Sequence, residues 1–174
     1  MAEFGSLPGV LAASPQARLR ALDGRSDLAA LLGDLDVALT HVAGLRCAHG
    51  PVIDNWPALL DYLRLTHAFS PVEIARVLHL DGRSRLIADE VISRGTIDEA
   101  TIHVREVIRR AMELHAVSIV LVHNHPSGDP APSRADIDLT RRIARAGQPL
   151  GIAVHDHLIM AESGHASMRE LGLI

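Results

Sequence analysis

The sequence predicts an α/β fold of the layered α+β type, in which helices flank a central mixed β-sheet and a short all-helical unit precedes it. Strand-like and helix-like patterns alternate from residue 72 to the C-terminus, which is typical of a layered domain of about four to six strands. Residues 117–122 form a continuous apolar run, as expected of a central strand covered on both faces. Residues 1–50 carry leucines at three- and four-residue steps and show no strand pattern, so this part is expected to be helical.

A break at Gly50-Pro51 predicts two regions, a helical region over residues 1–50 and a larger region over residues 52–174. The length of the chain suits one domain with a small appendage. In the helical region, Ser14-Pro15 and Ser26-Asp27 are expected to start helices, because serine side chains can cap the free amide groups of a first turn.

The first half of the larger region is expected to form a helix, a hairpin and a second helix. The expected elements are a helix from a cap at Asp54 to about residue 65, a strand over 72–80, a turn over 81–84, a partner strand over 85–93 and a helix over 103–114. Alternating apolar and polar residues predict the two strands, and the Asp-Gly pair between them predicts a hairpin turn.

The second half continues the alternation of strands and helices. After the apolar run, a loop rich in Pro and Gly leads to a helix from Ser133 to about residue 146. One or two strands follow over 152–154 and 157–160, then a turn at Gly164 and a final helical turn over 167–171.

Composition and charge exclude several classes of function. The formal net charge is −4 and the isoelectric point is near 6.2, so weak or no nucleic-acid binding is expected, since tight sequence-independent binders carry a basic face. The single cysteine, Cys47, leaves neither a disulfide framework nor a thiolate zinc site. No apolar run approaches the length of a membrane span, and the first residues lack the features of a signal peptide. A cytoplasmic protein with no membrane partner is expected, and a homo-oligomer is left open.

Metal-ligand residue types gather at a usable spacing between residues 119 and 140. On a strand, residues i and i+2 point to the same face, so His123 and His125 can converge on one ion. Pro126 favours an extended backbone at His125, and Asp136, one turn into the following helix, can supply a third ligand. Two neutral imidazoles, one carboxylate and an open fourth position are the ligand set of catalytic zinc sites. The sequence therefore predicts one zinc ion per chain.

Part of the same stretch also has a purely structural interpretation. Ser133 as N-cap and Asp136 three residues later have the spacing of a capping box, with Asp in place of the usual Glu. An acidic residue in the first turn is also favoured by the helix dipole. For this pair alone both interpretations stay open, whereas the pair together with the two histidines favours a metal site.

The fourteen residues from 123 to 136 read His-Asn-His-Pro-Ser-Gly-Asp-Pro-Ala-Pro-Ser-Arg-Ala-Asp. They closely resemble the JAMM metal motif, which is His-x-His, seven residues, Ser, two residues and Asp. Residues 52–174 as a whole are similar to the RadC family of bacterial proteins, long labelled DNA repair proteins. The similarity includes Leu80-Asp81, Gly95-Thr96 and Asp156-His157. It implies a JAB/MPN domain with a cytidine-deaminase-like fold.

The resemblance also implies an activity and roles for individual residues. His123, His125 and Asp136 would be the zinc ligands, and Ser133 would help to stabilise the oxyanion of a tetrahedral intermediate. The implied enzyme is a zinc metallopeptidase or isopeptidase, in which zinc-bound hydroxide attacks an amide carbonyl of a peptide or protein-like substrate.

Such chemistry needs a carboxylate that shuttles a proton to the leaving amine. The resemblance assigns this role of general base to Glu90. From the residues alone, Glu73, Asp89 and Glu99 are its rivals. The pair Asp156-His157 is a candidate for orienting the metal ligands, and a core or strand-pairing role is its alternative.

A second hypothesis is a nucleic-acid-associated module of recombination or repair. Relatives carry a helix-hairpin-helix-like region, and the stretch from Phe4 to Ser14 is similar to part of it. The expected Gly-x-Gly hairpin, which presents backbone amides to a phosphate, is reduced to Asp23-Gly24-Arg25. Together with the negative net charge, this degenerate hairpin argues against tight DNA binding.

Overall fold

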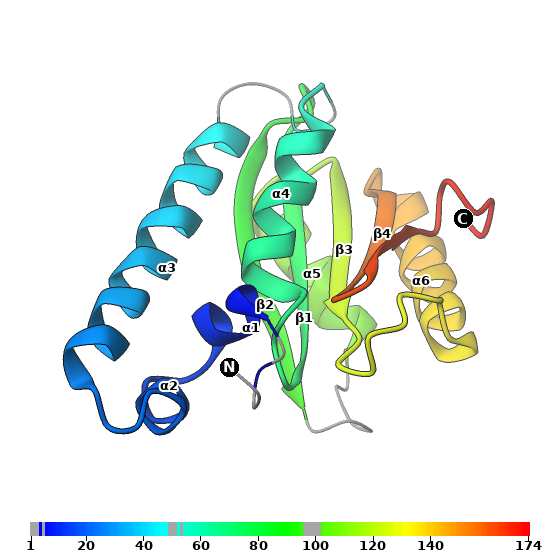
Figure 1. The fold of residues 1–174 in the computed structure, drawn as a ribbon. Coiled ribbons are helices and arrows are strands. Elements are labelled where there is room, and N and C mark those ends of the chain that lie inside the picture. Colours follow the sequence, from blue (N-terminus) through cyan, green and yellow to red (C-terminus); the bar gives the residue numbers. More distant parts are fainter. Residues whose placement is uncertain (1–3, 5, 49–51, 53, 96–101) are drawn as a thin grey trace.

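A five-stranded β-sheet forms the middle layer of the molecule (Figure 1). The computed structural model describes residues 4, 6–48, 52, 54–95 and 102–174. The strands are β1 (Glu73–Leu80), β2 (Leu86–Gly95), β3 (Ser118–Asn124), β4 (Ala153–Ala161) and β5 (Gly164–Ser167). Their order is β2-β1-β3-β4-β5; β3 and β4 run parallel, and the other neighbouring pairs are antiparallel. The mixed sheet predicted from the sequence is confirmed.

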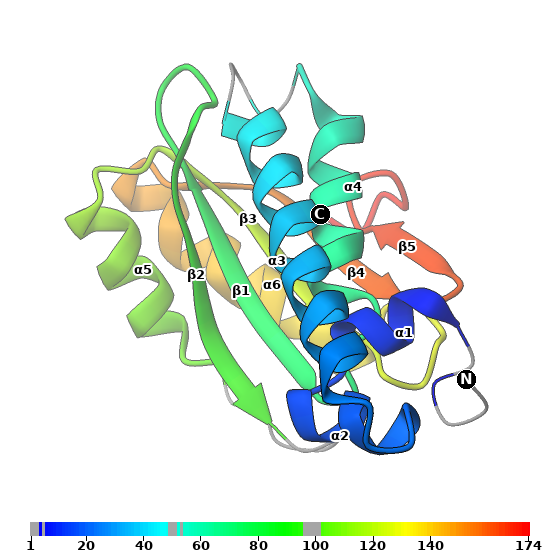
Figure 2. The ribbon, with the colours of Figure 1, turned by 60° about the vertical axis from the view of Figure 1, so that its left-hand side comes forward.

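Helices cover both faces of this sheet (Figures 1 and 2). They are α1 (Leu7–Ala12), α2 (Pro15–Ala21), α3 (Ser26–Ala48), α4 (Trp56–His67), α5 (Val104–Glu113) and α6 (Arg134–Gly147), followed by the short 3-10 turn η1 (Gln148–Leu150). One face is covered by α4, against which α1 and α3 pack, and the other face by α5 and α6. The layered fold with helices at the N-terminus is as predicted.

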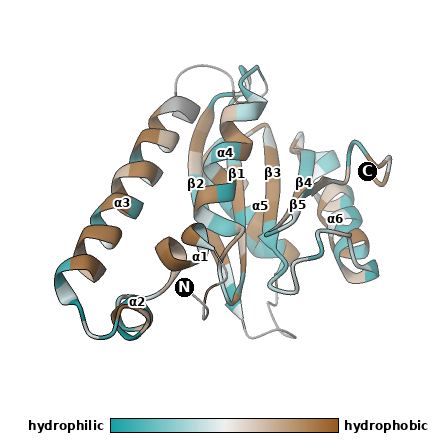
Figure 3. Cartoon of the chain, in the orientation of Figure 1, coloured by the Kyte–Doolittle hydropathy of each residue, from teal (hydrophilic) through white to brown (hydrophobic). Residues whose placement is uncertain are grey.

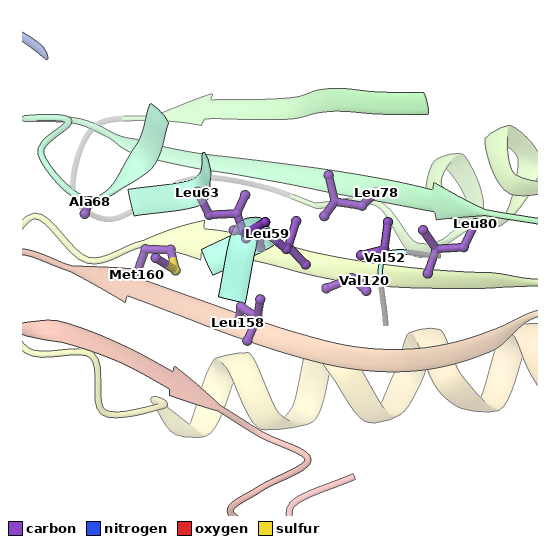
Figure 4. Close-up of a cluster of buried hydrophobic side chains, with 11 residues drawn as sticks. Val52, Leu59, Leu63, Ala68, Leu78, Leu80, Val120, Leu158 and Met160 are labelled. Carbon is purple, nitrogen blue, oxygen red and sulfur yellow. The ribbon is translucent and has the colours of Figure 1, made fainter. Parts of the chain in front are cut away.

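The apolar run is a central strand with a separate core on each side. Val120 and Val122 of β3 point to α4, where they join Leu63 in one buried cluster (Figure 4). Ile119 and Leu121 point the other way and join the cluster under α5 and α6. Because side chains alternate along a strand, β3 needs apolar residues at every position, and this explains its unbroken run.

The helix expected to start from a cap at Asp54 begins later than predicted. α4 starts at Trp56, and its N-cap residue, Asn55, makes no side-chain capping hydrogen bond. Pro57 lies in the first turn, where its fixed φ fits the helix and its missing N–H is not needed. This proline therefore favours a helix start at Trp56, and the helix continues to His67.

One continuous strand, β4, covers the segment expected to hold one or two strands. Its second half pairs with β5, which the sequence did not predict, with Leu158 opposite Ser167. The buried carboxylate of Asp156 accepts a hydrogen bond from the Ser167 hydroxyl at 2.6 Å and holds the two strands together. Ser167 ends β5, and the expected final turn over 167–171 follows it as a single helical turn, in which the amide of Leu171 donates to the carbonyl of Ser167 at 3.1 Å.

The N-terminal helices are linked by short turns. Ser14 caps α2 as expected, since its Oγ accepts the amide hydrogen of Ala17 at 3.2 Å. Gly24 adopts a φ of 80° in the turn between α2 and α3, a conformation that glycine accepts without strain. The predicted break at Gly50-Pro51 lies outside the described residues, so the division of the chain at that point stays a prediction.

Helix α3 corrects one expectation about apolar segments. Ser26–Leu45 is long and apolar enough to cross a membrane by length and composition, with a mean hydropathy of 1.5, and it is the one such helix in the part of the chain that the structure describes. The expectation that no segment would meet this criterion is wrong. The same helix contains Asp34 and Asp36 and packs against α1, α2 and α4 of its own chain, as helices of globular folds do.

Leu63 anchors α4 on the sheet and has no exposed surface. Leu63→Ala should lower the free energy of unfolding by about 2–5 kcal/mol, because it leaves a cavity between α4 and the strands. Urea unfolding followed by circular dichroism measures this. The control is Met112→Ala on α5, where the side chain is 52% exposed. A loss no larger than that of the control would contradict the packing of α4 described above.

Candidate metal centre

The candidate site lies where β3 ends and α6 begins. His123 belongs to β3 and His125 follows its last residue, so both side chains point to the same side of the sheet, as the i and i+2 spacing predicts. The amide of His125 donates to the carbonyl of Met160 at 2.8 Å, which extends the pairing with β4 by one residue. Asp136 lies in the first turn of α6 and reaches back to both histidines.

These three side chains converge on a small volume. Nε2 of His123 and Nε2 of His125 are 2.9 Å apart. Asp136 places Oδ1 3.3 Å from Nε2 of His123 and Oδ2 3.6 Å from Nε2 of His125. Among the residues that the structure describes, they are the one group of three or more His, Cys, Asp or Glu side chains that could hold a metal ion.

The hydrogen bond made by Nδ1 of His125 shows which of the two ring nitrogens carries the hydrogen. This nitrogen lies 2.9 Å from the backbone carbonyl oxygen of Asp129. A carbonyl oxygen can only accept, so Nδ1 carries the hydrogen and Nε2 of the neutral ring carries a lone pair.

A buried chain of hydrogen bonds makes the same assignment for His123. The hydroxyl of Thr140 donates to the backbone carbonyl of Asp136 at 2.6 Å, so its oxygen accepts from Nδ1 of His157, which is 2.6 Å away. Nε2 of His157 then accepts from Nδ1 of His123 at 2.8 Å. Nε2 of His123 is therefore also left with a lone pair.

The site consequently holds two nitrogen lone pairs and a carboxylate that face one another. Lone pairs 2.9 Å apart repel unless a proton or a cation lies between them. Tetrahedral ligand atoms at 2.0–2.1 Å from a zinc ion lie about 3.3 Å from one another, and the spacings here run from 2.9 to 3.6 Å. The residues present therefore fit a divalent metal ion held by two imidazoles and one carboxylate.

Ser133 and Asp136 form the predicted capping box. The amide of Ser133 donates to Oδ2 of Asp136 at 2.8 Å, and the amide of Asp136 donates to Oγ of Ser133 at 3.2 Å. The box fixes the carboxylate with Oδ1 towards His123, so the structural interpretation and the metal site coexist in one side chain. The Ser133 oxygen acts as an acceptor in the box, which leaves its hydroxyl hydrogen out of the cap.

Burial and neighbouring charges tune the protonation of the site. Burial lowers the pKa of His123 to about 4 and that of His157 to about 3, so both rings are neutral at pH 7, as metal binding requires. Burial alone would raise the pKa of Asp136, but the neighbouring imidazoles of His125 and His123 and the hydrogen bond from the amide of Ser133 hold it below its ordinary value. The Asp136 carboxylate in turn raises the pKa of His125, because its negative charge favours the protonated ring.

The structure does not bring Glu90, the predicted general base, to this cluster. Arg110 of α5 binds both of its carboxylate oxygens, at 2.6 Å and 2.8 Å, and this lowers the pKa of Glu90. The strand register explains the separation, because Glu90 lies opposite Val77, two residues along β1 from Ala75, and it is Ala75 that lies opposite His123. Glu90 borders a different pocket, of about 520 Å³, between β2 and α5. Its role as base stays a prediction that this geometry does not support.

Glu73, one of the rivals, is coupled to the cluster. It lies two residues before Ala75 on β1 and thus on the same face of the sheet as His123. Burial raises the pKa of Glu73, the nearby His125 lowers it and the Asp136 carboxylate raises it, and the net pKa lies above its ordinary value. Glu73 therefore lies on the same face of the sheet as the cluster and is close enough for its charge to interact with those of His125 and Asp136.

Of the other two rivals, Asp89 is not at the site. Asp89 lies on the opposite face of the sheet, where Arg76 and the hydroxyl of Tyr62 each bind it at 2.7 Å. Burial and this contact raise the pKa of Tyr62 to about 12. Glu99 lies outside the described residues.

Asn124, between the two histidines, points away from the cluster and ties down the segment before β1. Its side chain accepts a hydrogen bond from the amide of Ile74 at 2.8 Å. It donates to the carbonyl oxygens of Val72, at 3.0 Å, and Ser70, at 3.2 Å. The asparagine side chain is fully buried, and these bonds fix the backbone on both sides of Glu73.

Of the pair predicted to orient the ligands, His157 reaches the cluster and Asp156 does not. His157 contacts His123, whereas the next side chain on β4, Asp156, points away and binds the hydroxyl of Ser167. Thr140 completes the chain of hydrogen bonds, although its sequence pattern indicated only a buried helix position. Its place four residues after the third ligand, on the same side of α6, is the signal that identifies it.

A pocket of about 160 Å³ lies beside His125. Helix α1 and the segment between α4 and β1 form one side, with Phe4 and Phe69, and the loop after β3 forms the other, with Pro126. Glu162 adds an exposed carboxylate. Helix α1 and its flanking residues therefore contribute to the surroundings of the candidate site.

The mixed sheet, its two helical layers and the His and Asp cluster at the end of β3 define a protein of the JAB-domain class. Residues 53–173 match the family model of the RadC-like JAB domain. A UPF0758 protein of Rhodobacter capsulatus is 45% identical over 172 residues, which cover 98% of this chain and 80% of that relative. The chain belongs to the RadC-like JAB domain family, as its resemblance indicated.

In the metal-free protein, both His123 and His157 should carry their hydrogen on Nδ1, because each donates from that atom into the chain that ends at Asp136. Nitrogen-15 NMR of the imidazole rings measures the tautomer directly. Thr140→Val removes the acceptor for His157 and should abolish the preference, whereas Thr66→Val on α4 should not. A dominant Nε2–H form of His123 in the unmodified protein would contradict the chain.

Proposed function

We propose that this protein is a zinc-dependent hydrolase of amide bonds, of the metallopeptidase or isopeptidase type, that acts on a peptide or protein-like substrate. The observation that carries the proposal is the convergence of the His123 and His125 lone pairs with the Asp136 carboxylate. Hydrogen bonds direct the ring hydrogens away from the centre. Membership of the JAB domain family, which often includes metallohydrolases, supports it.

Three protein ligands with a position left open are the ligand count of catalytic zinc sites, whereas structural sites use four. Bound there, a zinc ion would lower the pKa of a water molecule to about 7 and polarise the scissile carbonyl. The protein would hold the metal through Nε2 of His123, Nε2 of His125 and the carboxylate of Asp136. The pocket beside His125 is suited to a substrate side chain next to the scissile bond.

We assign the proton shuttle to Glu73 in place of Glu90. Its pKa lies above the ordinary value, which brings a carboxylate closer to the working pH of a general base that later acts as an acid. Glu90 is less suited, because the guanidinium of Arg110 occupies both its oxygens and lowers its pKa. Glu73 would take a proton from the attacking water and give it to the leaving amine.

Ser133 is assigned to the oxyanion. Its hydroxyl hydrogen is not used in the capping box, so it can be donated to the negative oxygen that forms when the carbonyl is attacked. Ser133 also lies at the N-terminus of α6, where the helix dipole favours negative charge.

Protein purified without added zinc should contain about one zinc ion per chain, as mass spectrometry of the elements measures. His123→Ala and Asp136→Ala should each lose the metal, because two ligands do not hold zinc tightly. His165→Ala, at an exposed histidine of β5, should keep it. Metal content at background in the unmodified protein would contradict the proposed function.

Glu73→Gln should keep the metal and lower turnover by a factor of about 10²–10⁴, because it removes the proton shuttle and no ligand. Glu90→Gln is the matched control and should retain most of the turnover, since it changes a carboxylate held by Arg110. Cleavage of a mixed peptide library, read by mass spectrometry, measures both. The opposite ranking of the two variants would return the role of base to Glu90.

A further inference from the structure

A stripe of exposed apolar side chains runs along one side of α3, and Figure 3 shows this helix as one of the most hydrophobic parts of the ribbon. Leu31, Leu35 and Val42 are 61%, 42% and 56% exposed, and Ala38 between them is exposed as well. Single exposed apolar residues are ordinary, but a continuous stripe of them marks an interaction surface.

The opposite side of α3 already has partners within the chain. Ala43 is buried there. A Cβ atom at Gly33 would lie 3.1 Å from Arg18 of α2, and one at Gly44 would lie 3.7 Å from Tyr62 of α4. With 3.6 residues per turn, these positions fall on the side of the helix away from the stripe. The residues that the structure describes therefore leave the stripe uncovered.

The spacing of the stripe is that of a coiled coil. Apolar residues recur at steps of three and four along this side, starting from the half-buried Leu28 and continuing through the exposed Leu31, Leu35, Ala38, Val42 and Leu45. Steps of three and four average 3.5 residues, which keeps an apolar seam facing a partner helix along its whole length. The pattern thus indicates that another helix covers the stripe.

We propose that this helix is α3 of a second copy of the chain, packed antiparallel. In that arrangement Leu31 meets the partner's Val42, and Leu35 meets the partner's Ala38. Two-fold symmetry repeats each contact, so the same stripe serves both copies. Each of these two contacts joins a leucine to a smaller side chain, so the distance between the two helix axes can stay constant along the stripe.

The polar residues beside the stripe favour this register. In this antiparallel register, the exposed carboxylate of Asp34 would lie next to the imidazole of the partner's His41. The two-fold symmetry would form this contact twice. Parallel helices would instead place Asp34 next to the partner's Leu39. Complementary groups that flank an apolar seam select orientation and register in coiled coils.

A lipid surface fits the stripe less well than a second copy does. Residues 26–45 contain Asp27, Asp34 and Asp36 and no arginine or lysine, whereas helices that lie on membranes are rich in basic residues. Asp34 at the edge of the stripe would be desolvated in a bilayer and paired in the dimer.

Sedimentation velocity of the full chain tests the proposal. Between about 1 and 200 µM it should show a reversible monomer–dimer equilibrium, since a single helix pair is smaller than a standard interface. Val42→Asp should weaken the dimer by at least about tenfold, a change of about 1.4 kcal/mol. Val37→Asp is the matched control, because Val37 is 68% exposed on the same helix but lies outside the stripe. Circular dichroism shows whether each variant is folded.

Cysteine cross-linking tests the orientation. With Cys47 replaced by serine, a mixture of Leu31→Cys and Val42→Cys chains should form a disulfide-linked dimer, and neither chain alone should do so. Self-linking of Leu31→Cys chains would show parallel helices and overturn the proposed register.

Self-association itself is overturned if the unmodified chain stays monomeric over the whole concentration range. It is also overturned if the stripe binds lipid instead, that is, if the chain sediments with phosphatidylcholine or phosphatidylglycerol vesicles and Val42→Asp abolishes this. None of these measurements involves metal or turnover, so their outcome is independent of the proposed hydrolase function.

Discussion

Two imidazole nitrogens that carry no hydrogen and lie 2.9 Å apart are the constraint on which this structure depends. An unrestrained pair would rotate apart, because facing lone pairs repel in a buried place. Neither ring can turn here: the carbonyl of Asp129 holds His125, and His157 holds His123. The buried chain of hydrogen bonds from His123 ends on the backbone of Asp136, so the first and third candidate ligands belong to one network. The sheet and α6 together hold two facing lone pairs and a carboxylate in place, and this arrangement is favourable only when a positive charge lies between them.

The acidic residues around the sheet divide according to what neutralises them. Asp89 is bound by Arg76 on one face, and Glu90 is bound by Arg110 on the other. Both are ion pairs that join neighbouring elements of the fold. Glu73 instead has His125, a candidate ligand, as the basic group that acts on its pKa. In the proposed function the metal ion would bind that basic partner, which would leave the Glu73 carboxylate available for proton transfer, whereas Asp89 and Glu90 keep their arginine partners.

Local patterns predicted the elements and the candidate ligands, because each of these depends on neighbours in the sequence. The His-x-His spacing places two rings on one face of a strand, and the Ser-x-x-Asp spacing fixes the start of a helix wherever that helix packs. The proposed base could not be identified in this way, because Glu73 and Glu90 are both strand residues on the same face of the sheet. Their distance from the cluster depends on how β1 pairs with β2 and with β3, and the pairing of β1 with β2 shifts register between Ala75 and Arg76. The contact of His157 likewise needs the parallel pairing of β3 with β4. No local pattern encodes either register.

The buried side chain of Asn124 determines at which stage the backbone around Glu73 becomes ordered. Its hydrogen bonds to Ser70, Val72 and Ile74 belong to the folded core and are made before any substrate arrives. The backbone that carries Glu73 is thus ordered during folding, and its conformational entropy is lost at that stage. If Glu73 is the base, as proposed, this carboxylate is preorganised before a substrate binds. A site built in this way would act as a rigid template, to which the substrate adapts.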